Sequence, residues 1–321
     1  MELRRLGRSD ILVPPLCFGG NVFGWTADEA TSFRLLDALV EAGFTFIDTA
    51  DVYSRWADGN QGGESEAIIG RWMKARGNRA KLTIATKVGS DMGRGKVCLA
   101  PDYIASAVEA SLTRLQTDYI DLYQSHWDDP DTPFEEVLGA YDVLIRAGKV
   151  RLIGASNLSP ARLFEALAVA AREKLPRYET LQPEYNLYAR AGFEAELEPI
   201  CRGNGLGVIS YFSLAAGFLT GKYRTPADAA KSARGEEVVA TYLNPRGDRI
   251  LAALDQVAAA RSVSPAQVAL AWVMARPSLT AAIASASRPE QLGDLIAAAT
   301  LDLTPAEIDK LDAASRWKDA A

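Results

Sequence analysis

The sequence predicts a (β/α)8 barrel, in which eight parallel strands alternate with helices, and residues 1–321 are expected to form it as a single domain. Three observations favour this fold class. Eight short apolar runs are separated by longer segments with helical periodicity. The length of 321 residues suits one barrel, which commonly takes about 250 residues plus insertions. The alternative, an open dinucleotide-binding sheet, would show GxGxxG after its first strand, and residues 18–24 do not match that pattern.

The first expected element is a small hairpin over residues 1–15, with its turn at residues 7–10, which caps the bottom of the barrel. The barrel strands then follow as short apolar runs. They are expected at residues 16–18, 44–47, 82–86, 119–124, 151–155, 179–182, 206–211 and 280–284.

Helices are predicted between these runs, where apolar side chains recur on one helical face. Thr132, Ser264 and Thr304 are expected to cap helices, because each is followed by proline and, three positions on, by Glu or Gln. Ser159 before Pro160 is a weaker version of the pattern. The polar stretch 215–248 is long for a connection, so we expect either a functional loop or a disordered one there. The barrel is also expected to carry extra helices.

The composition excludes several classes of protein. With 35 basic and 41 acidic residues the net charge is −6, and no basic run favours binding to nucleic acid. Three widely spaced cysteines without a CxxC motif predict no disulfide framework and a reducing compartment. The first residues lack an apolar signal core, and no apolar run approaches the roughly 20 residues of a membrane span. A cytoplasmic protein without a membrane partner is expected.

Polar residues gather where the predicted strands end, which in a barrel is the face that carries the active site. They are Asp48, Lys87, His126, Ser156, Asn157, Gln182 and Tyr211. One polar residue after a strand is a common turn, but so many in succession are hard to explain as turns alone. We therefore expect an active site at these strand ends.

Four residues suit the reduction of a carbonyl group, which becomes an alkoxide when it accepts a hydride and then needs a proton. Tyr53 can donate that proton, Lys87 can lower the tyrosine pKa, and Asp48 can hold Lys87. His126 can donate a hydrogen bond to the carbonyl oxygen. Taken singly, each residue also has an ordinary structural explanation. Asp48 suits a helix cap and Tyr53 a surface aromatic residue. Lys87 suits a solvated loop cation, and His126 suits a buried core histidine.

His126 is the only histidine of the chain, and this excludes further chemistry. One histidine without clustered cysteines does not make an ordinary zinc site, so no metal is expected. A serine hydrolase is disfavoured because the sequence has no GxSxG motif.

Several segments resemble the aldo-keto reductase family in their order and spacing, from about residue 3 to about residue 315. They read FTFIDTADVYS, IATKVG, YIDLYQSHWDDPDTP, GKVRLIGASNLS, LQPEYNLY, SYFSLAAGFLTGKY and SASRPEQL. The resemblance implies a catalytic tetrad of Asp48, Tyr53, Lys87 and His126, with Tyr53 as general acid. It also implies a nicotinamide cofactor bound without a Rossmann fold.

The resemblance implies contacts along the whole cofactor. The nicotinamide carboxamide would contact Ser156, Asn157 and Gln182, and its ring would stack on Tyr211. The pyrophosphate loop would include Leu214, Gly217, Leu219 and Lys222, and the adenosine end would contact Ser285, Ser287, Arg288, Gln291 and Asp294. The chain departs from the family at Ser285, where glycine is common, and at Leu295, where asparagine is common and would contact the adenine.

Arg288 favours NADPH over NAD(H), because a guanidinium suits a 2′-phosphate, although a surface cation at a helix start is the alternative. Trp25, Trp56 and Trp127 lie in loops on the expected active-site face, where they suit a pocket for an apolar or flat carbonyl compound. For Trp56, ordinary loop packing is an equal alternative.

The expected activity is the NADPH-dependent reduction of a small aldehyde or ketone. Two alternatives share the fold and the site: a nicotinamide-binding regulatory subunit similar to potassium-channel β-subunits, and an NADP-dependent dehydrogenase that oxidises an alcohol or sugar. The sequence leaves the physiological substrate open, and a homo-oligomer is possible.

Overall fold

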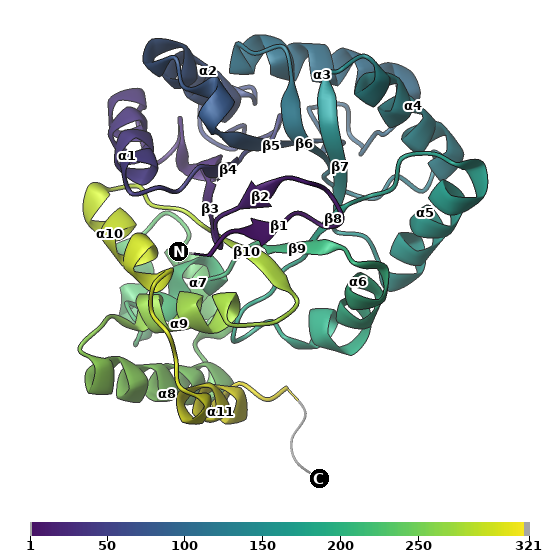
Figure 1. The fold of residues 1–321 in the computed structure, drawn as a ribbon. Coiled ribbons are helices and arrows are strands. Elements are labelled where there is room, and N and C mark those ends of the chain that lie inside the picture. The colour runs from purple at the N-terminus through teal and green to yellow at the C-terminus, as the bar shows by residue number, and fades with distance from the viewer. Residues whose placement is uncertain (1, 318–321) are drawn as a thin grey trace.

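The computed structural model describes residues 2–317, and its centre is a closed barrel of eight parallel strands in the order β10-β3-β4-β5-β6-β7-β8-β9. Figure 1 shows the barrel end on, with the helices around it. The strands are β3 (Leu16–Gly19), β4 (Phe46–Asp48), β5 (Thr83–Val88), β6 (Ile120–Ser125), β7 (Val150–Ser156), β8 (Thr180–Gln182), β9 (Gly207–Ser210) and β10 (Leu279–Ala284). The predicted fold class and all eight predicted strands are confirmed.

Helices follow the strands, and further helices follow β9 and β10. One helix follows each strand from β3 to β8: α1 (Glu29–Glu41), α2 (Glu64–Arg76), α3 (Pro101–Leu115), α4 (Phe134–Arg146), α5 (Pro160–Glu173) and α6 (Glu198–Asn204). After β9 come α7 (Gly235–Tyr242), α8 (Pro245–Arg261) and α9 (Pro265–Met274), and after β10 come α10 (Pro289–Ala298) and α11 (Pro305–Ala314). No helix within residues 2–317 combines the length and the apolar character that crossing a bilayer requires.

A two-stranded hairpin, β1 (Arg4–Arg5) and β2 (Leu12–Val13), lies across the end of the barrel where the strands begin. Leu6, Ile11 and Val13 pack against side chains that point into the barrel, among them Cys17 and Phe46. The burial of these apolar side chains closes this end of the barrel. The predicted cap is confirmed.

The predicted helix caps are confirmed at Ser159, Ser264 and Thr304, whose side chains accept hydrogen bonds from backbone N–H groups of the first turn. The prediction at Thr132 is wrong, because α4 begins at Phe134 and has Pro133 as its N-cap. The Thr132 hydroxyl instead donates to Asp129 Oδ2 at 2.8 Å and stabilises the loop before the helix.

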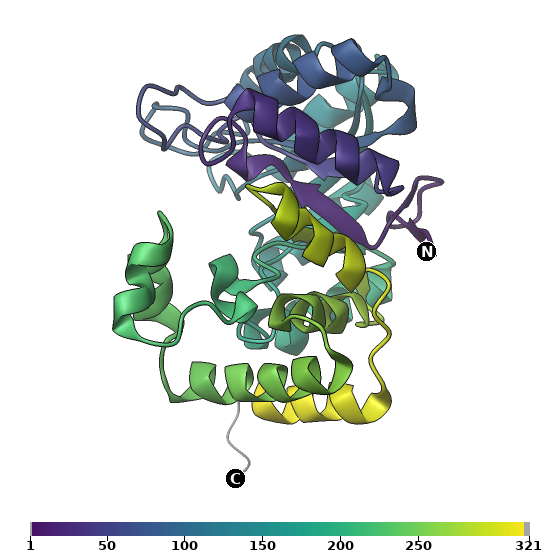
Figure 2. The same cartoon turned by 90° about the vertical axis from the view of Figure 1, so that its left-hand side faces the viewer.

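The stretch 215–248 is folded. It contains two short 3-10 helices, η4 (Ala215–Thr220) and η5 (Pro226–Lys231), followed by α7 and the start of α8. Phe218, Val238 and Tyr242 are buried, which ties the stretch to the hydrophobic core. In Figure 2, α7 and the loops after β4 and β5 project from the side of the barrel opposite the hairpin. The stretch therefore stands on the face where the strands end.

Candidate active site

A pocket of about 630 Å³ opens where the barrel strands end. Its lining includes most of the residues singled out from the sequence: Trp25, Tyr53, Trp56, His126, Trp127, Ser156, Asn157, Gln182, Tyr211, Leu214, Gly217, Lys222, Ser285, Ser287, Gln291 and Asp294. A second cavity of about 590 Å³ lies at the hairpin end and holds none of these residues. Asp48 and Lys87 are buried outside the pocket lining.

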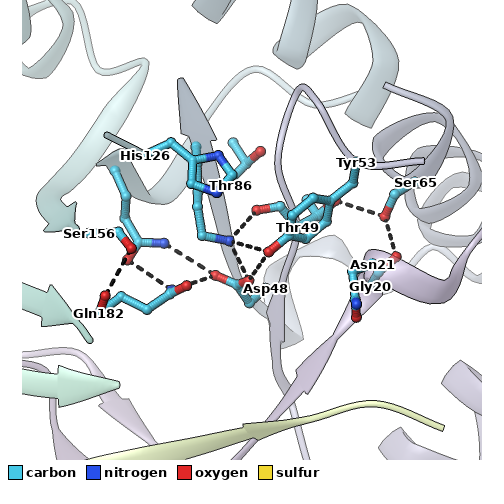
Figure 3. Close-up of polar contacts among 12 residues, drawn as sticks. Gly20, Asn21, Asp48, Thr49, Tyr53, Ser65, Thr86, His126, Ser156 and Gln182 are labelled. Carbon is cyan, nitrogen blue, oxygen red and sulfur yellow. Dashed lines mark hydrogen bonds and ion pairs between the residues drawn. The ribbon is translucent and has the colours of Figure 1, made fainter. Parts of the chain in front are cut away.

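Tyr53, Lys87 and Asp48 form a hydrogen-bonded cluster. Figure 3 shows Tyr53 and Asp48 of this cluster together with His126. Lys87 Nζ donates to the Tyr53 hydroxyl at 2.8 Å and to Asp48 Oδ2 at 2.5 Å. It also donates to the Thr49 carbonyl at 3.0 Å, and the Tyr53 hydroxyl donates to Asp48 Oδ2 at 3.4 Å. The ammonium group is therefore held by three oxygen atoms, one of which is the tyrosine hydroxyl itself.

The alternation of side chains along a strand explains why Asp48 and Lys87 meet. Phe46 on β4 and Ala85 on β5 point into the barrel. Side chains two residues apart share a face of a strand, so Asp48 and Lys87 point inward at the ends of these strands. β4 and β5 pair in parallel, with Asp48 opposite Ala85, which brings the two inward side chains together.

Gln124 on β6 also contacts the cluster and was not predicted from the sequence. Its Nε2 donates to Asp48 Oδ1 at 3.2 Å, and Gln182 Nε2 donates to the same oxygen at 2.9 Å. The signal was available: Gln124 lies two residues after inward-pointing Leu122, in the pattern that places Lys87. Gln182, predicted as a carboxamide contact, thus already donates to two side chains of the protein, Asp48 and Gln124.

The pKa of Tyr53 is raised by burial to about 12, and the Lys87 ammonium offsets only part of that rise. The prediction that the pKa of Tyr53 is lowered is therefore wrong, because the net pKa is raised. Lys87 by itself does lower that pKa, as predicted. Burial lowers the pKa of Lys87, but Asp48 and Tyr53 raise it more, so the net pKa lies above its ordinary value. At neutral pH the tyrosine carries its proton and the lysine its charge.

His126 lies beside Tyr53, with the two ring centroids 6.0 Å apart. Burial lowers the pKa of His126 well below its ordinary value, and the Lys87 ammonium lowers it further, so the imidazole is neutral at pH 7. Its Nδ1 is 2.9 Å from the Ser90 hydroxyl, a contact that the sequence did not predict. When this hydroxyl donates to Nδ1, Nε2 carries the proton.

Residues predicted from the sequence to contact the nicotinamide are joined by hydrogen bonds. The Tyr211 hydroxyl donates to Asn157 Oδ1 at 2.9 Å, and Asn157 Nδ2 donates to the His126 carbonyl at 2.9 Å. The Ser156 hydroxyl donates to the Gln182 carbonyl at 2.8 Å. These bonds fix the side chains that form the pocket wall.

Residues expected at the adenosine end have partners of their own. Gln291 Oε1 accepts from the Ser287 N–H at 2.9 Å, and Asp294 Oδ1 accepts from Gln267 at 2.8 Å. The Ser285 hydroxyl donates to Asn21 at 2.6 Å. Leu219 is fully buried and Arg288 is the exposed N-cap of α10; neither lines the pocket, and their cofactor contacts stay predictions.

Aromatic rings form the other wall of the pocket. The centroid of the Trp56 ring lies 6.0 Å from that of Tyr53 and 5.6 Å from that of Trp25. Trp127 stacks on His126 at 6.0 Å, and Phe212 lines the pocket as well. Trp56 and Trp127 are 47% and 45% exposed, so both present free ring surface at the pocket.

Within residues 2–317 no group of three His, Cys, Asp or Glu side chains is placed to hold a metal ion. Cys17, Cys98 and Cys201 are free thiols, and Cys17 is a buried core residue as expected.

Known proteins match this chain over nearly its whole length. The model of the aldo/keto reductase family matches residues 15–316. The "Uncharacterized oxidoreductase YrpG" of Bacillus subtilis is 36% identical over 94% of this chain and 92% of its own. The "Probable voltage-gated potassium channel subunit beta" of rice, Oryza sativa subsp. japonica, is 33% identical over 99% and 98%. The "Aldo-keto reductase yakc [NADP(+)]" of Schizosaccharomyces pombe is 30% identical over 96% and 89%. The chain belongs to the aldo/keto reductase family.

Proposed function

We propose that this oxidoreductase reduces an aldehyde or ketone to the alcohol with NADPH, and that Tyr53 is the general acid. One observation carries the proposal. The Tyr53 hydroxyl lies at the wall of an aromatic-lined pocket and accepts a hydrogen bond from a buried, charge-paired Lys87. Such a hydroxyl can bind a carbonyl oxygen and release its proton while the ammonium stabilises the tyrosinate that remains.

Each residue of the cluster has a separate role in this proposal. Bound NADPH would supply the hydride. Tyr53 donates a hydrogen bond to the substrate oxygen and then transfers its proton to it. Neutral His126 donates a second hydrogen bond to that oxygen and orients it. Asp48 keeps Lys87 charged and in place beside the tyrosine.

The pocket residues fit a nicotinamide dinucleotide. The pocket extends from Tyr53 and His126 to Lys222 and Asp294. Gly217 has a φ of +97°, and a Cβ built there would lie 3.4 Å from Lys222 Nζ, so the loop backbone and an ammonium group lie close together in the pocket lining. Backbone and ammonium groups of this kind bind phosphates.

The preference for NADPH rests on Arg288, and on a relative whose name specifies NADP(+). The Arg288→Ala variant is expected to raise the KM for NADPH by about tenfold, because it removes a charge-assisted hydrogen bond to the 2′-phosphate. The KM for NADH in the same variant is the internal control and should change less than about twofold. Equal changes in the KM values for both cofactors would show that Arg288 does not bind the 2′-phosphate.

A panel of aldehydes and ketones, with NADPH oxidation followed by absorbance, tests the activity itself. Turnover of at least one compound by the wild type, with matching alcohol formation, is the expected result. The similarity to the rice protein supports a second candidate, a nicotinamide-binding regulatory subunit. Tight NADPH binding without turnover of any carbonyl compound would favour that role.

The same residues would serve an NADP-dependent dehydrogenase that works in the oxidative direction. Rates measured with NADP⁺ and the alcohol products of the panel, at neutral pH, compare the two directions. Faster oxidation than reduction at matched concentrations would favour the dehydrogenase.

A further inference from the structure

Ser90 contacts the ring of His126 without lining the pocket, and the proposed reaction assigns it no role. It stands two residues after the end of β5 and is only 5% exposed. Its hydroxyl oxygen lies 2.9 Å from His126 Nδ1 and has no other hydrogen-bond partner within residues 2–317. This buried hydroxyl therefore serves a single nitrogen atom.

The ends of two neighbouring strands place Ser90 beside the ring. The His126 N–H donates to the Val88 carbonyl at 2.8 Å, which ties the residue after β6 to the end of β5. Gly89 then turns the chain with a φ of +106°, and a Cβ built on it would lie 2.7 Å from Leu99 Cδ2. Because only glycine adopts this backbone conformation without strain, the sequence itself sets the turn that leads into Ser90.

The imidazole ring has little freedom to rotate. The Trp127 indole stacks on it, and the Tyr53 ring meets it edge to face. With Nδ1 bonded to Ser90, the other nitrogen, Nε2, is left for a ligand. Nε2 makes no hydrogen bond within residues 2–317, yet it is not among the buried polar atoms that lack a partner, and His126 lines the pocket. Nε2 is therefore accessible from the pocket.

Two arrangements of hydrogen atoms fit the contact, since a neutral imidazole carries one N–H. In the first, the Ser90 hydroxyl donates to Nδ1 and the ring proton is on Nε2. In the second, Nδ1 donates to Ser90, and the hydroxyl hydrogen is left without an acceptor within residues 2–317. A buried hydroxyl without an acceptor costs free energy, so the first arrangement is favoured.

We propose that Ser90 is a positioning residue that fixes the ring proton of His126 on Nε2. The ring then presents an N–H to the carbonyl oxygen of the substrate. In the opposite arrangement the lone pair of Nε2 would repel that oxygen, and Tyr53 would have to bind it without help. This inference rests on the proposed reductase function, because it assigns the carbonyl oxygen to Tyr53 and His126.

The Ser90→Ala variant tests the kinetic consequence. Without the hydroxyl, both ring nitrogen atoms can carry the proton, so kcat/KM for aldehyde reduction is expected to fall by about tenfold. The Kd for NADPH should change less than about twofold. Ser90→Thr keeps a hydroxyl and should recover most of the loss. The matched control is Ser32→Ala in α1, where a buried serine donates to the Asp28 carbonyl at 2.7 Å outside the pocket lining; it should keep wild-type kinetics.

A double variant shows whether Ser90 acts through His126. His126→Phe keeps an aromatic ring against Trp127 but has no ring proton to place. Adding Ser90→Ala in this background should change kcat/KM less than about twofold, because the two substitutions remove the same interaction. A further tenfold loss would mean that Ser90 contributes by another route, and would overturn the inference.

Neutron diffraction locates the ring proton without any turnover, so it separates this inference from the proposed reductase activity. In deuterium-exchanged crystals of the wild type at pH 7, the ring deuteron of His126 is expected on Nε2, with the Ser90 deuteron directed at Nδ1. In Ser90→Ala a deuteron is expected on Nδ1 in at least part of the molecules. A deuteron on Nδ1 in the wild type, or an unchanged ring in the variant, would overturn the inference whether or not the protein reduces any aldehyde.

Discussion

The Tyr53→Phe variant should reduce aldehydes with a kcat/KM about 10²- to 10⁴-fold below that of the wild type, while its Kd for NADPH changes less than about threefold. Phenylalanine keeps the ring that packs against Trp56 and His126 and removes only the hydroxyl. The alkoxide that forms on hydride transfer would then lack its proton donor. Stopped assays of alcohol formation, beside fluorescence titration with NADPH, measure the two quantities.

Tyr119→Phe provides a matched control, because it removes a tyrosine hydroxyl next to the start of β6, at the opposite end of that strand from the pocket. It should retain wild-type kinetics. Near-wild-type activity of Tyr53→Phe with bound NADPH would contradict the assignment of the general acid. So would equal losses in both variants, which would indicate a general loss of stability.

The pH profile gives an independent check on the same residue. With a pKa of about 12, Tyr53 stays protonated across the neutral range, and His126 stays neutral because its pKa is lowered. The kcat/KM for reduction by the wild type should therefore be flat from about pH 6.5 to about pH 9. A fall in rate with a midpoint near pH 7 would show that one of the two groups titrates there.

The Lys87→Met variant should lose both stability and activity. Its free energy of unfolding is expected to fall by about 3–5 kcal/mol, because Asp48 is left buried without its cation. The Tyr53 hydroxyl also loses the ammonium that stabilises tyrosinate, so kcat should fall by at least about 100-fold. Urea unfolding followed by circular dichroism measures the first loss, and NADPH oxidation in the absence of urea measures the second.

A double variant separates the two effects of Lys87. Asp48→Asn combined with Lys87→Met removes both buried charges and should recover most of the lost stability. Its activity should remain low, since the hydroxyl still lacks a neighbouring ammonium. If Lys87→Met unfolds at the wild-type urea concentration, or if the double variant regains activity, the proposed role of the lysine is wrong.

The strand positions and the four central residues could be predicted because each depends on local sequence. A strand of a parallel barrel is a short apolar run, and the active-site side chains follow where each run ends. Asp48, Lys87 and His126 stand at such ends, so the fold alone brings them to one face. The ion pair between Asp48 and Lys87 then follows from the inward alternation of two neighbouring strands.

What the sequence did not predict depends on contacts between distant segments. Ser90 meets His126 across 36 positions of the chain, and Gln124 meets Asp48 across 76. Thr132 has the sequence pattern of a helix cap, yet its hydroxyl bonds to Asp129 within the preceding loop. The raised pKa of Tyr53 could not be predicted because it depends on how deeply the hydroxyl is buried, and burial outweighs the effect of the nearby ammonium. The contact between Arg234 and Trp25 likewise depends on how the stretch after β9 folds.

The solitary histidine gives the pocket a built-in spectroscopic reporter. Because His126 is the chain's one imidazole, its ring resonances in an untagged, nitrogen-labelled sample need no assignment by substitution. The indole of Trp127 stacks on that ring with an interplanar angle of 16°, so the resonances carry a ring-current shift that depends on this geometry. A molecule that displaces either ring, or that accepts a hydrogen bond from Nε2, will move a single pair of signals in an otherwise empty region of the spectrum. Binding at the reaction centre can thus be followed directly in the intact protein, separately from binding elsewhere on the barrel.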